Sequence, residues 1–378
     1  MAGRTSTQRT ALEKQNAAIM AVFERAGFSQ IAPDIIQPAD IFLERSGEDI
    51  RARTFVFNDP DGNELCLRPD LTVPACRFHL SHAAKPEQEA RYSYLGPAFR
   101  FPDEKLSPQE FTQAGLEWFA ASDAVAAEAR ILKLAIQALE AAGASGLKET
   151  LGDVGLFASL LDDTKMPDRW RRRLAHQFWR PEAFKNLLHN FATAPAKKRS
   201  SISDVVDAVN SDAVGTVSAW IDKNTIVLQG TRSVEEIAER LSEKHSDRSE
   251  APLQASAVQN IEAYLAIVGS AVDVKLPLNA VQAGKAYAQS VAAYEQRLDA
   301  MEEQGLNPKR FQFSANFGRE IEYYTGFVFQ IEAVIGNEVV SLAGGGRYDE
   351  LLSDLGAPTK ISAIGCAIHT ERLQAVLS

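Results

Sequence analysis

The sequence predicts an α+β fold in which a mainly antiparallel sheet, flanked by helices, is interrupted by a helical insertion. Strand-like segments with tight-turn signals occur towards both ends of the 378-residue chain. Residues 161–259 lack such segments and show helical periodicity with polar connectors instead. We therefore expect one discontinuous domain, residues 1–160 with 260–378, and a separate helical insertion at 161–259.

The chain opens with a predicted helix and a strand pair. The apolar residues of 7–26 recur at helical spacing and share one face, and Gly27 follows as a stop signal. Residues 55–67 predict a β-hairpin, whose turn contains Pro60 and Gly62. The N-terminal part therefore combines a helix with a first antiparallel pair.

A second strand pair follows. Residues 92–101 are rich in aromatic and apolar side chains, and Pro102 ends the strand because proline cannot donate a ladder hydrogen bond. Phe111–Phe119 is the predicted antiparallel mate. Ser122 is expected to cap the next helix, which ends near Gly143.

The insertion and the C-terminal part complete the expected order. Within the insertion, residues 171–191 show helical patterning, and Ser233 with Glu236 forms a capping box. The elements expected after it are a helix at about 281–304, a strand at 311–317, a hairpin over 323–346 that turns at Gly336 and Asn337, a strand at 361–368 and a helix at 370–377.

The charge balance argues against a nucleic-acid-binding protein. The formal net charge is −10 at pH 7, whereas proteins that neutralise phosphate backbones carry a surplus of Lys and Arg. Two local basic clusters exist, at 168–173 and 197–199. A solvated helix face or a subunit contact explains both better than an RNA groove does.

Membrane, metal and cofactor sites are also not expected. No stretch approaches the roughly 18 apolar residues of a membrane span, and no secretory leader opens the chain, so we expect a cytoplasmic protein. Three cysteines without C-x-x-C spacing are expected to be buried free thiols. Of six histidines, only His79 and His82 form a close pair, and no carboxylate–histidine motif accompanies them.

Four segments concentrate charged and small residues among the strands: 67–72 (LRPDLT), 99–117, 319–326 (REIEYYTG) and 343–373. Each alone has a simpler explanation. The glycines after Ala343 could serve close packing, the tyrosine pair could belong to a core, and arginines could pair with surface carboxylates. The four together, in this order, favour a ligand site.

This order resembles the catalytic core of the class II aminoacyl-tRNA synthetases, in the histidyl-tRNA synthetase branch. The resemblance covers about 1–120 and 310–378, through the segments APDIIQPADIFLERSG, LRPDLT, GPAFRF with EFTQAGLE, REIEYYTG and ERL. It implies an antiparallel sheet backed by helices and a homodimer formed through the motif 1 region around Pro33. The chain stops soon after Leu373, so we expect no anticodon-binding domain.

The resemblance also implies a pocket for free histidine. Carboxylates, hydroxyls and an amide suit its ammonium and imidazole groups, whose polar atoms need partners when buried. Asp70 is one methylene shorter than the glutamate of the family's LRPE segment. The histidine-binding residues implied by the resemblance are Asp70, Thr72, Gln113, Glu117, Arg319, Tyr323 and Tyr324.

The nucleotide half of the site departs from the synthetase pattern. Pro102 stands where the family has the glutamate that contacts adenine, and Lys105 is the only cation in an acidic motif 2 loop. His369 replaces a motif 3 glycine. Adenylation needs positioning and charge neutralisation together, so we expect no catalytic residues and read Arg100 and Arg372 as anion-binding remnants.

A histidyl-tRNA synthetase-like domain of this kind resembles the regulatory subunits of ATP phosphoribosyltransferase, the first enzyme of histidine biosynthesis. The resemblance implies a non-catalytic protein that pairs with a short catalytic subunit, typically as a hetero-octamer, and contributes to feedback by histidine. One alternative is a truncated synthetase-like enzyme that still activates histidine with ATP. Another is an RNA-binding paralogue, which the charge balance disfavours.

Overall fold

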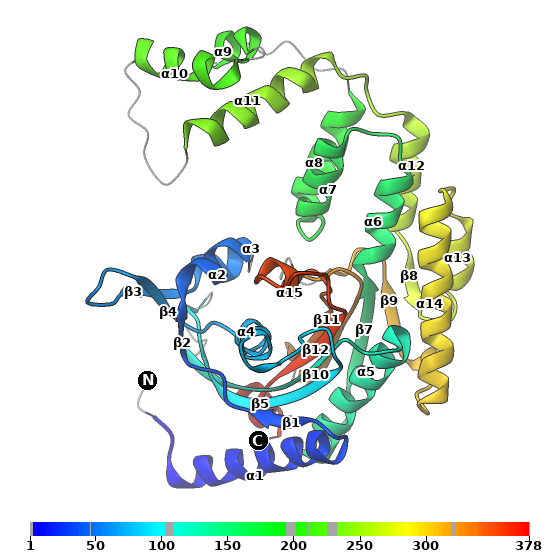
Figure 1. Ribbon diagram of the computed structural model, residues 1–378. Coiled ribbons are helices and arrows are strands. Elements are labelled where there is room, and N and C mark those ends of the chain that lie inside the picture. The colour runs from blue at the N-terminus through cyan, green and yellow to red at the C-terminus, as the bar shows by residue number, and fades with distance from the viewer. Residues whose placement is uncertain are drawn as a thin grey trace. The chain divides into compact units, whose positions relative to one another are not determined.

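The computed structural model describes residues 3–45, 47–102, 109–193, 202–209, 212–224, 233–318, 323–336 and 338–377. The chain forms two compact units. The larger unit comprises residues 1–163 and 262–378, and the smaller unit comprises residues 164–261. Figure 1 labels their helices and strands.

The larger unit is built on one main sheet. Among the described residues it has nine strands in the order β1-β5-β6-β12-β11-β10-β7-β9-β8. Only the β1–β5 and β7–β9 neighbours pair in parallel in the described part, so the predicted, mainly antiparallel sheet is confirmed. The strands span β1 Ser29–Ile31, β5 Ala90–Phe99, β6 Glu110–Phe119, β7 Lys148–Asp153, β8 Val268–Ser270, β9 Gln312–Ser314, β10 Phe327–Ile335, β11 Glu338–Arg347 and β12 Ala363–His369.

The strand pair expected around the motif 2 loop is present. β5 and β6 pair antiparallel from Ala90 opposite Phe119 to Phe99 opposite Glu110. Because partners across an antiparallel ladder share a face, this register decides which β6 side chains lie next to which β5 side chains. Residues 103–108, which carry most of the loop and Lys105, lie outside the described residues.

A second, three-stranded sheet has the order β2-β4-β3. Its first strand lies within the predicted motif 1 region. The sheet comprises β2 (Ile36–Pro38), β3 (Phe55–Asn58) and β4 (Glu64–Leu67). The predicted hairpin is therefore confirmed. The Asp59 carboxylate shapes its turn by accepting hydrogen bonds from the backbone N–H groups of Asp61 at 2.9 Å and Asn63 at 2.8 Å.

Helices cover both sides of the main sheet. Figure 1 shows α4 within the curve of the sheet and α1 on the opposite side. The helices of this unit are α1 Ser6–Arg25, α2 Ala39–Arg45, α3 Gly47–Ala52, α4 Thr72–His82, α5 Ala124–Ala141, α6 Val154–Asp163, α13 Lys275–Ala280, α14 Lys285–Glu303, the 3-10 helix η1 Pro308–Arg310, α15 Leu351–Asp354 and α16 Thr370–Leu377.

The cap of α5 differs from the prediction. Asp123, not Ser122, is the N-cap, and its carboxylate accepts a hydrogen bond from Ala126 N at 2.9 Å. Three residues earlier, Ala120 has a positive φ of 50° where the chain leaves β6. The cap therefore lies one residue later than predicted, a difference within the usual uncertainty of helix boundaries.

One central strand was not predicted. β7 pairs with β10 on one side and β9 on the other, yet its six residues, KETLGD, carry little strand signal. Gly152 is required there because a Cβ would overlap the backbone oxygen of Phe317. The strand is therefore set by its neighbours in the sheet and not by its own composition.

A buried ion network lies where β7, β11, α5 and α14 meet. Arg297 pairs with Glu128 at 2.5 Å and with Asp153 at 2.8 Å, and these three side chains are at most 7% exposed. Arg347 also pairs with Glu128, at 2.5 Å. The Asp153 carboxylate in addition accepts the backbone N–H of Gly155 at 2.8 Å at the start of α6. The network thus ties four elements together.

Helices are the regular elements of the smaller unit among its described residues. They are α7 Asp168–Gln177, α8 Pro181–Ala192, α9 Ser203–Ala208, α10 Ala213–Lys223 and α11 Val234–Ser249. α12 (Ala255–Leu265) crosses from this unit into the larger one. The Ser233–Glu236 capping box is present as predicted. None of the helices in the described part of the chain combines the length and apolar character needed to cross a membrane.

Candidate functional site

A cluster of buried polar side chains lies on one face of the main sheet, beside the N-terminal end of α4. Gln113 and Glu117 lie four residues apart on β6, so both point to the same face. Thr72 is the first residue of α4, and Asp70 lies two residues before it. The four predicted residues are all at most 7% exposed. The sequence motifs are thus brought to one side of the sheet by strand alternation and by the turn into α4.

Two glycines make room for this cluster. Gly115 lies opposite Tyr94 in the β5–β6 ladder, and the Tyr94 ring occupies the space that a Cβ at Gly115 would need. Gly365 lies opposite Glu117 in the β12–β6 ladder, and a Cβ there would overlap the Glu117 carboxylate. Polar side chains can therefore lie flat over the sheet at these positions.

Glu117 is the centre of the cluster. Its side chain is fully buried, and its Oε1 accepts a hydrogen bond from the Tyr94 hydroxyl at 3.0 Å. Its Oε2 accepts one from the Tyr348 hydroxyl. Burial raises the pKa of Glu117 from its usual 4.5 to about 8, and the hydroxyl groups around it oppose that rise. Among the described residues no ion pair neutralises this carboxylate.

Asp70 contributes a second buried carboxyl group. Its Oδ1 accepts a hydrogen bond from the backbone N–H of Val73 at 3.2 Å, whereas its Oδ2 is buried without a hydrogen-bond partner. Burial raises the pKa of Asp70, and the nearby charge of Arg100 lowers it. A buried acceptor without a partner is costly, so a donor from a ligand would stabilise it.

Gln113 is held by the segment between Asp70 and α4. Its Oε1 accepts a hydrogen bond from the backbone N–H of Leu71 at 3.2 Å. Because the amide oxygen of Gln113 accepts this bond, its NH₂ group is directed away from the Leu71 backbone. Thr72 reaches the cluster through its hydroxyl, which lies 3.5 Å from the Tyr94 hydroxyl.

The tyrosine pair predicted from REIEYYTG also lies at this cluster. The ring centroids of Tyr323 and Tyr324 are 5.0 Å apart, and Tyr323 packs edge-on against Tyr348 at 5.5 Å. Burial raises the pKa of Tyr323, so its hydroxyl remains protonated and able to donate. Arg319, predicted as part of the same site, lies outside the described residues.

The two predicted anion-binding arginines lie in different places. Arg100 donates from Nε to the backbone oxygen of Pro69 at 2.7 Å, which places it next to the Asp70 segment. Arg372 lies on α16 and donates to the backbone oxygen of Ser341 at 3.2 Å. The structure therefore associates Arg100 with the Glu117–Asp70 side of the sheet, and shows Arg372 bonded to β11.

His369 and Pro102, two departures from the synthetase pattern, both lie at described positions. His369 is opposite Gln113 in the β12–β6 ladder, and its ring lies 5.1 Å from that of Phe111. Pro102 follows Phe101, whose backbone oxygen accepts a hydrogen bond from Arg53 at 2.8 Å. Neither proline nor this histidine supplies a carboxylate.

The similarity of this chain to known proteins identifies its family. The family model described as Histidyl-tRNA synthetase matches residues 4–243 and 228–373. ATP phosphoribosyltransferase regulatory subunits of Brucella canis and Brucella ovis are each 35% identical to this chain over 349 residues, covering 90% of this chain and 91% of the relative. The chain belongs to the family of ATP phosphoribosyltransferase regulatory subunits.

Solved structures of this regulatory-subunit and synthetase group share the fold. A Bacillus halodurans structure described as an ATP phosphoribosyltransferase regulatory subunit/histidyl-tRNA synthetase has a TM-score of 0.69 at 20% identity, covering 100% of this chain and 82% of its own. Histidyl-tRNA synthetase from Nostoc has a TM-score of 0.63 at 16% identity, covering 100% of this chain and 75% of its own. The class II synthetase-like core predicted from the motifs is therefore confirmed.

Three buried polar residues of this regulatory-subunit chain were missed from the sequence. They are Tyr94 and Tyr348, which hold Glu117, and Arg68, which donates to the backbone oxygens of Pro97 at 2.8 Å and Pro33 at 2.5 Å. Two of them lie inside motifs that the sequence analysis singled out: Arg68 in LRPDLT and Tyr348 in the glycine-rich segment after Ala343. Tyr94 has no local motif, because only pairing places it over Gly115.

The raised pKa of Glu117 predicts a specific pH dependence of stability. Between about 4.5 and about 8 the folded chain holds a proton on Glu117 that the unfolded chain has lost, so this stabilising contribution is present at low pH and falls as pH rises. The slope is at most about 1.4 kcal/mol per pH unit for one group. Glu117→Gln should remove this slope.

Urea unfolding of both proteins at pH 5.5, 6.5 and 7.5 measures the effect. The difference in unfolding free energy between Glu117→Gln and the parent should shift in favour of the variant as pH rises. Glu110→Gln is the matched control, because Glu110 is exposed on the same strand and should leave the slope unchanged. Parallel pH profiles for parent and Glu117→Gln would contradict the prediction.

Proposed function

We propose that this chain is the cytoplasmic regulatory subunit of an ATP phosphoribosyltransferase, that a short catalytic subunit requires it for activity, and that it contributes to feedback inhibition by histidine. The main support for this proposal is the 35% identity of the chain, over 90% of its length, to proteins named ATP phosphoribosyltransferase regulatory subunit. The catalysed step would be the first of histidine biosynthesis, carried out by the partner and not by this chain.

The Glu117 cluster supports the proposed histidine site. Histidine carries an ammonium group and an imidazole, and both donate hydrogen bonds. The cluster offers the partnerless Oδ2 of Asp70 and the carboxylate of Glu117, two acceptors in a buried setting. A cationic ligand would stabilise the ionised form of both groups, which burial disfavours.

The nucleotide side supports the proposed absence of adenylation. Synthetase chemistry requires a positioned, neutralised triphosphate. Here Pro102 and His369 occupy two of the positions concerned, and Arg100 already donates to the Pro69 backbone oxygen. We therefore propose that the chain binds histidine without activating it.

Feedback requires more than a binding pocket. A ligand shifts a conformational equilibrium only if it binds the two states with different affinity. We propose that histidine favours an inhibited state of the complex. The Glu117 variant described in the Discussion distinguishes histidine bound at the Glu117 cluster from histidine bound between subunits.

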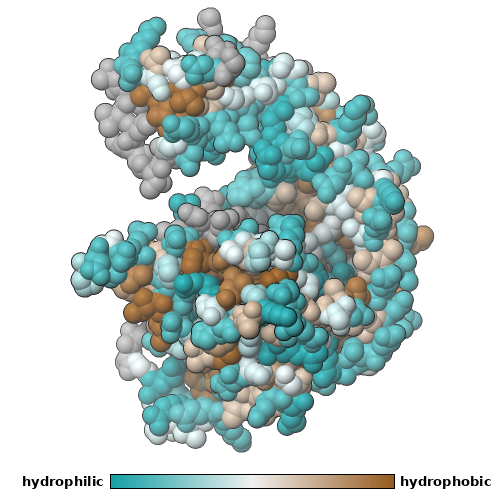
Figure 2. Space-filling view, viewed as in Figure 1, coloured by the Kyte–Doolittle hydropathy of each residue, from teal (hydrophilic) through white to brown (hydrophobic). Residues whose placement is uncertain are grey.

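An exposed apolar patch supports the proposed homodimer through the motif 1 region. On one face of the β2-β4-β3 sheet, Ile36 is 52% exposed and Phe57 is 37% exposed, because their ladder partners Leu67 and Leu65 lie two residues apart on β4. Figure 2 shows hydrophobic side chains gathered over this small sheet. Contiguous exposed apolar side chains of this kind are typical of protein interfaces. A hetero-octamer with the catalytic subunit is the proposed complete assembly.

Reconstitution with a short catalytic subunit tests the proposal. The condensation of ATP with phosphoribosyl pyrophosphate should be fast only when both chains are present, and histidine should inhibit the pair. Native mass measurement of the mixture should give an octamer. A catalytic chain that is equally active alone, or that does not co-purify with this one, would refute the assigned role.

A truncated synthetase-like enzyme is the second candidate, favoured by the match to the histidyl-tRNA synthetase model and by the presence of Arg100. Histidine-dependent exchange of pyrophosphate into ATP by the purified chain distinguishes the two. The regulatory role predicts no exchange above background. Robust exchange would establish adenylation and make this second candidate the better one.

A further inference from the structure

The helical unit carries a concave, cationic surface lined by side chains of α7, α8 and α11. We propose that the groove between α7, α8 and α11 binds a small molecule bearing a multiply charged phosphate group. The proposal rests on side chains within residues 164–261 and is independent of the Glu117 cluster.

The groove has the size of a small-molecule site. It comprises a hollow of about 440 Å³ at Arg173 and α11, and a hollow of about 640 Å³ along α7 and α8. Both are lined by Arg173, Arg240 and Glu243, so the two hollows adjoin. Small ligands occupy clefts of roughly 300–1,000 Å³.

The lining is strongly positive although the chain as a whole carries a charge of −10. Among the described residues that line the groove, Glu243 is the single carboxylate, and it pairs with Arg172 at 3.1 Å. The cationic residues of the lining are Arg169, Arg172, Arg173, Arg240 and Lys244. Three carboxylates pair with three of these arginines, so the surplus positive charge comes from Arg240 and Lys244. Two surplus charges favour an anion with more than one negative charge.

Hydrogen bonds to acidic residues hold two of these arginines, Arg169 and Arg173, in place. Asp247 on α11 accepts from Arg169 Nε at 2.8 Å and from Arg173 Nη1 at 2.6 Å. Glu250 accepts from Arg169 Nη2 at 2.6 Å. Such bonds hold the guanidinium groups before a ligand arrives, which lowers the conformational entropy lost on binding.

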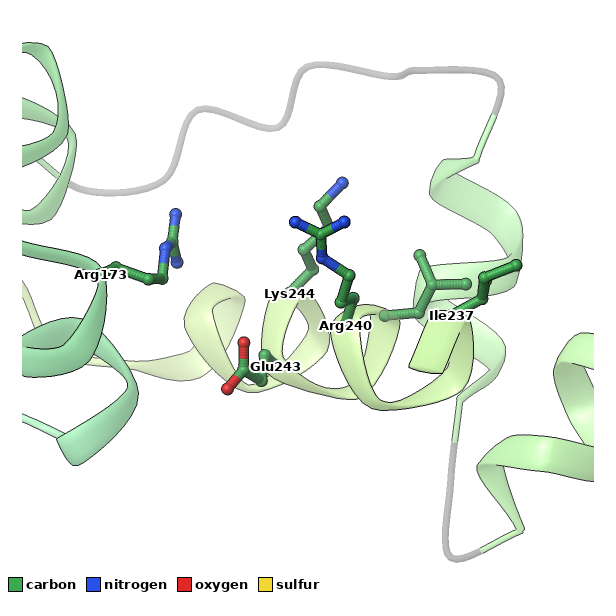
Figure 3. Close-up of a pocket in the computed structure, with 6 residues that line it drawn as sticks. Arg173, Ile237, Arg240, Glu243 and Lys244 are labelled. Atoms are coloured by element: carbon green, nitrogen blue, oxygen red, sulfur yellow. The ribbon is translucent and has the colours of Figure 1, made fainter. Parts of the chain in front are cut away.

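Arg240 and Lys244 are the cations left to meet a ligand. They lie four residues apart on α11, so both project from one face of the helix. Among the described residues neither takes part in an ion pair. Figure 3 shows the cationic ends of Arg173, Arg240 and Lys244 on the same side of the groove, with Glu243 directed away from them.

Neutral and apolar residues complete the site. Asn186 and Asn190 from α8 can donate hydrogen bonds to phosphate oxygens, and Ile237 and Leu241 supply an apolar surface for the organic part of a ligand. A long nucleic acid needs an extended basic surface, whereas among the described residues these cations line two adjoining hollows. The arrangement therefore fits a phosphorylated small molecule better.

Titration calorimetry on the full chain with inorganic tripolyphosphate at low salt tests the site. Arg240→Gln with Lys244→Gln should weaken binding by about ten-fold or more, because two charge-assisted contacts are removed. Both residues are exposed, so the fold should be unaffected. Lys185→Gln with Lys223→Gln is the matched control: it removes the same charge from exposed positions of the same unit and should change the affinity by less than about two-fold.

Other outcomes would overturn the proposal. Equal weakening in the groove and control variants would show non-specific attraction, and orthophosphate binding as tightly as tripolyphosphate would remove the requirement for multiple charge. A transfer-RNA-sized RNA that binds through Arg240 and Lys244 and is not displaced by tripolyphosphate would assign the groove to nucleic acid instead. None of these outcomes depends on histidine or on the catalytic partner, so the regulatory role is tested separately.

Discussion

Glu117→Ala is expected to lower the affinity of this chain for histidine by about 2–5 kcal/mol, roughly 30-fold or more. Glu117 is fully buried, and its two oxygens are held by the hydroxyl groups of Tyr94 and Tyr348. A cation bound there would lose its buried counter-charge in the variant, and the two tyrosine hydroxyls would lose their acceptor.

Calorimetric titration of histidine at pH 8 measures this effect. Glu110→Ala is the control, since it removes a carboxylate from an exposed position at the other end of β6 and should leave the affinity unchanged. Glu117→Gln should fall between the parent and alanine, because an amide keeps one acceptor but no charge. Unchanged affinity in Glu117→Ala, with the fold intact, would place the inhibitory histidine elsewhere, such as between subunits.

Arg297→Met is expected to destabilise the larger unit by about 3–5 kcal/mol, the range for breaking a buried ion pair by removing one partner. The substitution removes the ion-pair partner of Asp153, which is 7% exposed, whereas Glu128 keeps its pair with Arg347. Burial raises the pKa of Asp153, and the Arg297 charge opposes that rise. Without Arg297, Asp153 must take up a proton or the region must open.

Urea unfolding at pH 7 measures the loss. Arg9→Met is the control, because Arg9 pairs with Glu13 at 3.2 Å with both side chains more than 60% exposed, and such a pair contributes at most about 0.5 kcal/mol. Asp153→Asn with Arg297→Met should cost less than the sum of the single changes, since the double variant buries one charge fewer. A loss below about 1 kcal/mol in Arg297→Met would show that water reaches the network.

The fold was predicted where the sequence carries periodic or turn signals. The pairing of β5 with β6, the hairpin of β3 and β4, and the helical character of the insertion follow from local patterns. β7 was missed, because KETLGD has neither alternation nor aromatic residues and owes its place to β9 and β10. The cap of α5 was misplaced by one residue, from Asp123 to Ser122.

The candidate site was predicted in part. The motifs identified Asp70, Thr72, Gln113 and Glu117, and the structure places these buried residues on one side of the sheet. Their role in binding histidine stays a prediction. Arg319 lies outside the described residues, and Arg372 is bonded to β11.

The family, the order of the motifs and the chemistry of the predicted pocket follow from the sequence, because short stretches of residues carry each of them. The hydrogen bonds from Tyr94 and Tyr348 to Glu117 could be seen only in the folded chain, since Tyr348 lies 231 residues away along the chain. The same is true of the buried Asp70 oxygen without a partner. Such contacts depend on ladder register and packing between distant segments, which no local pattern specifies.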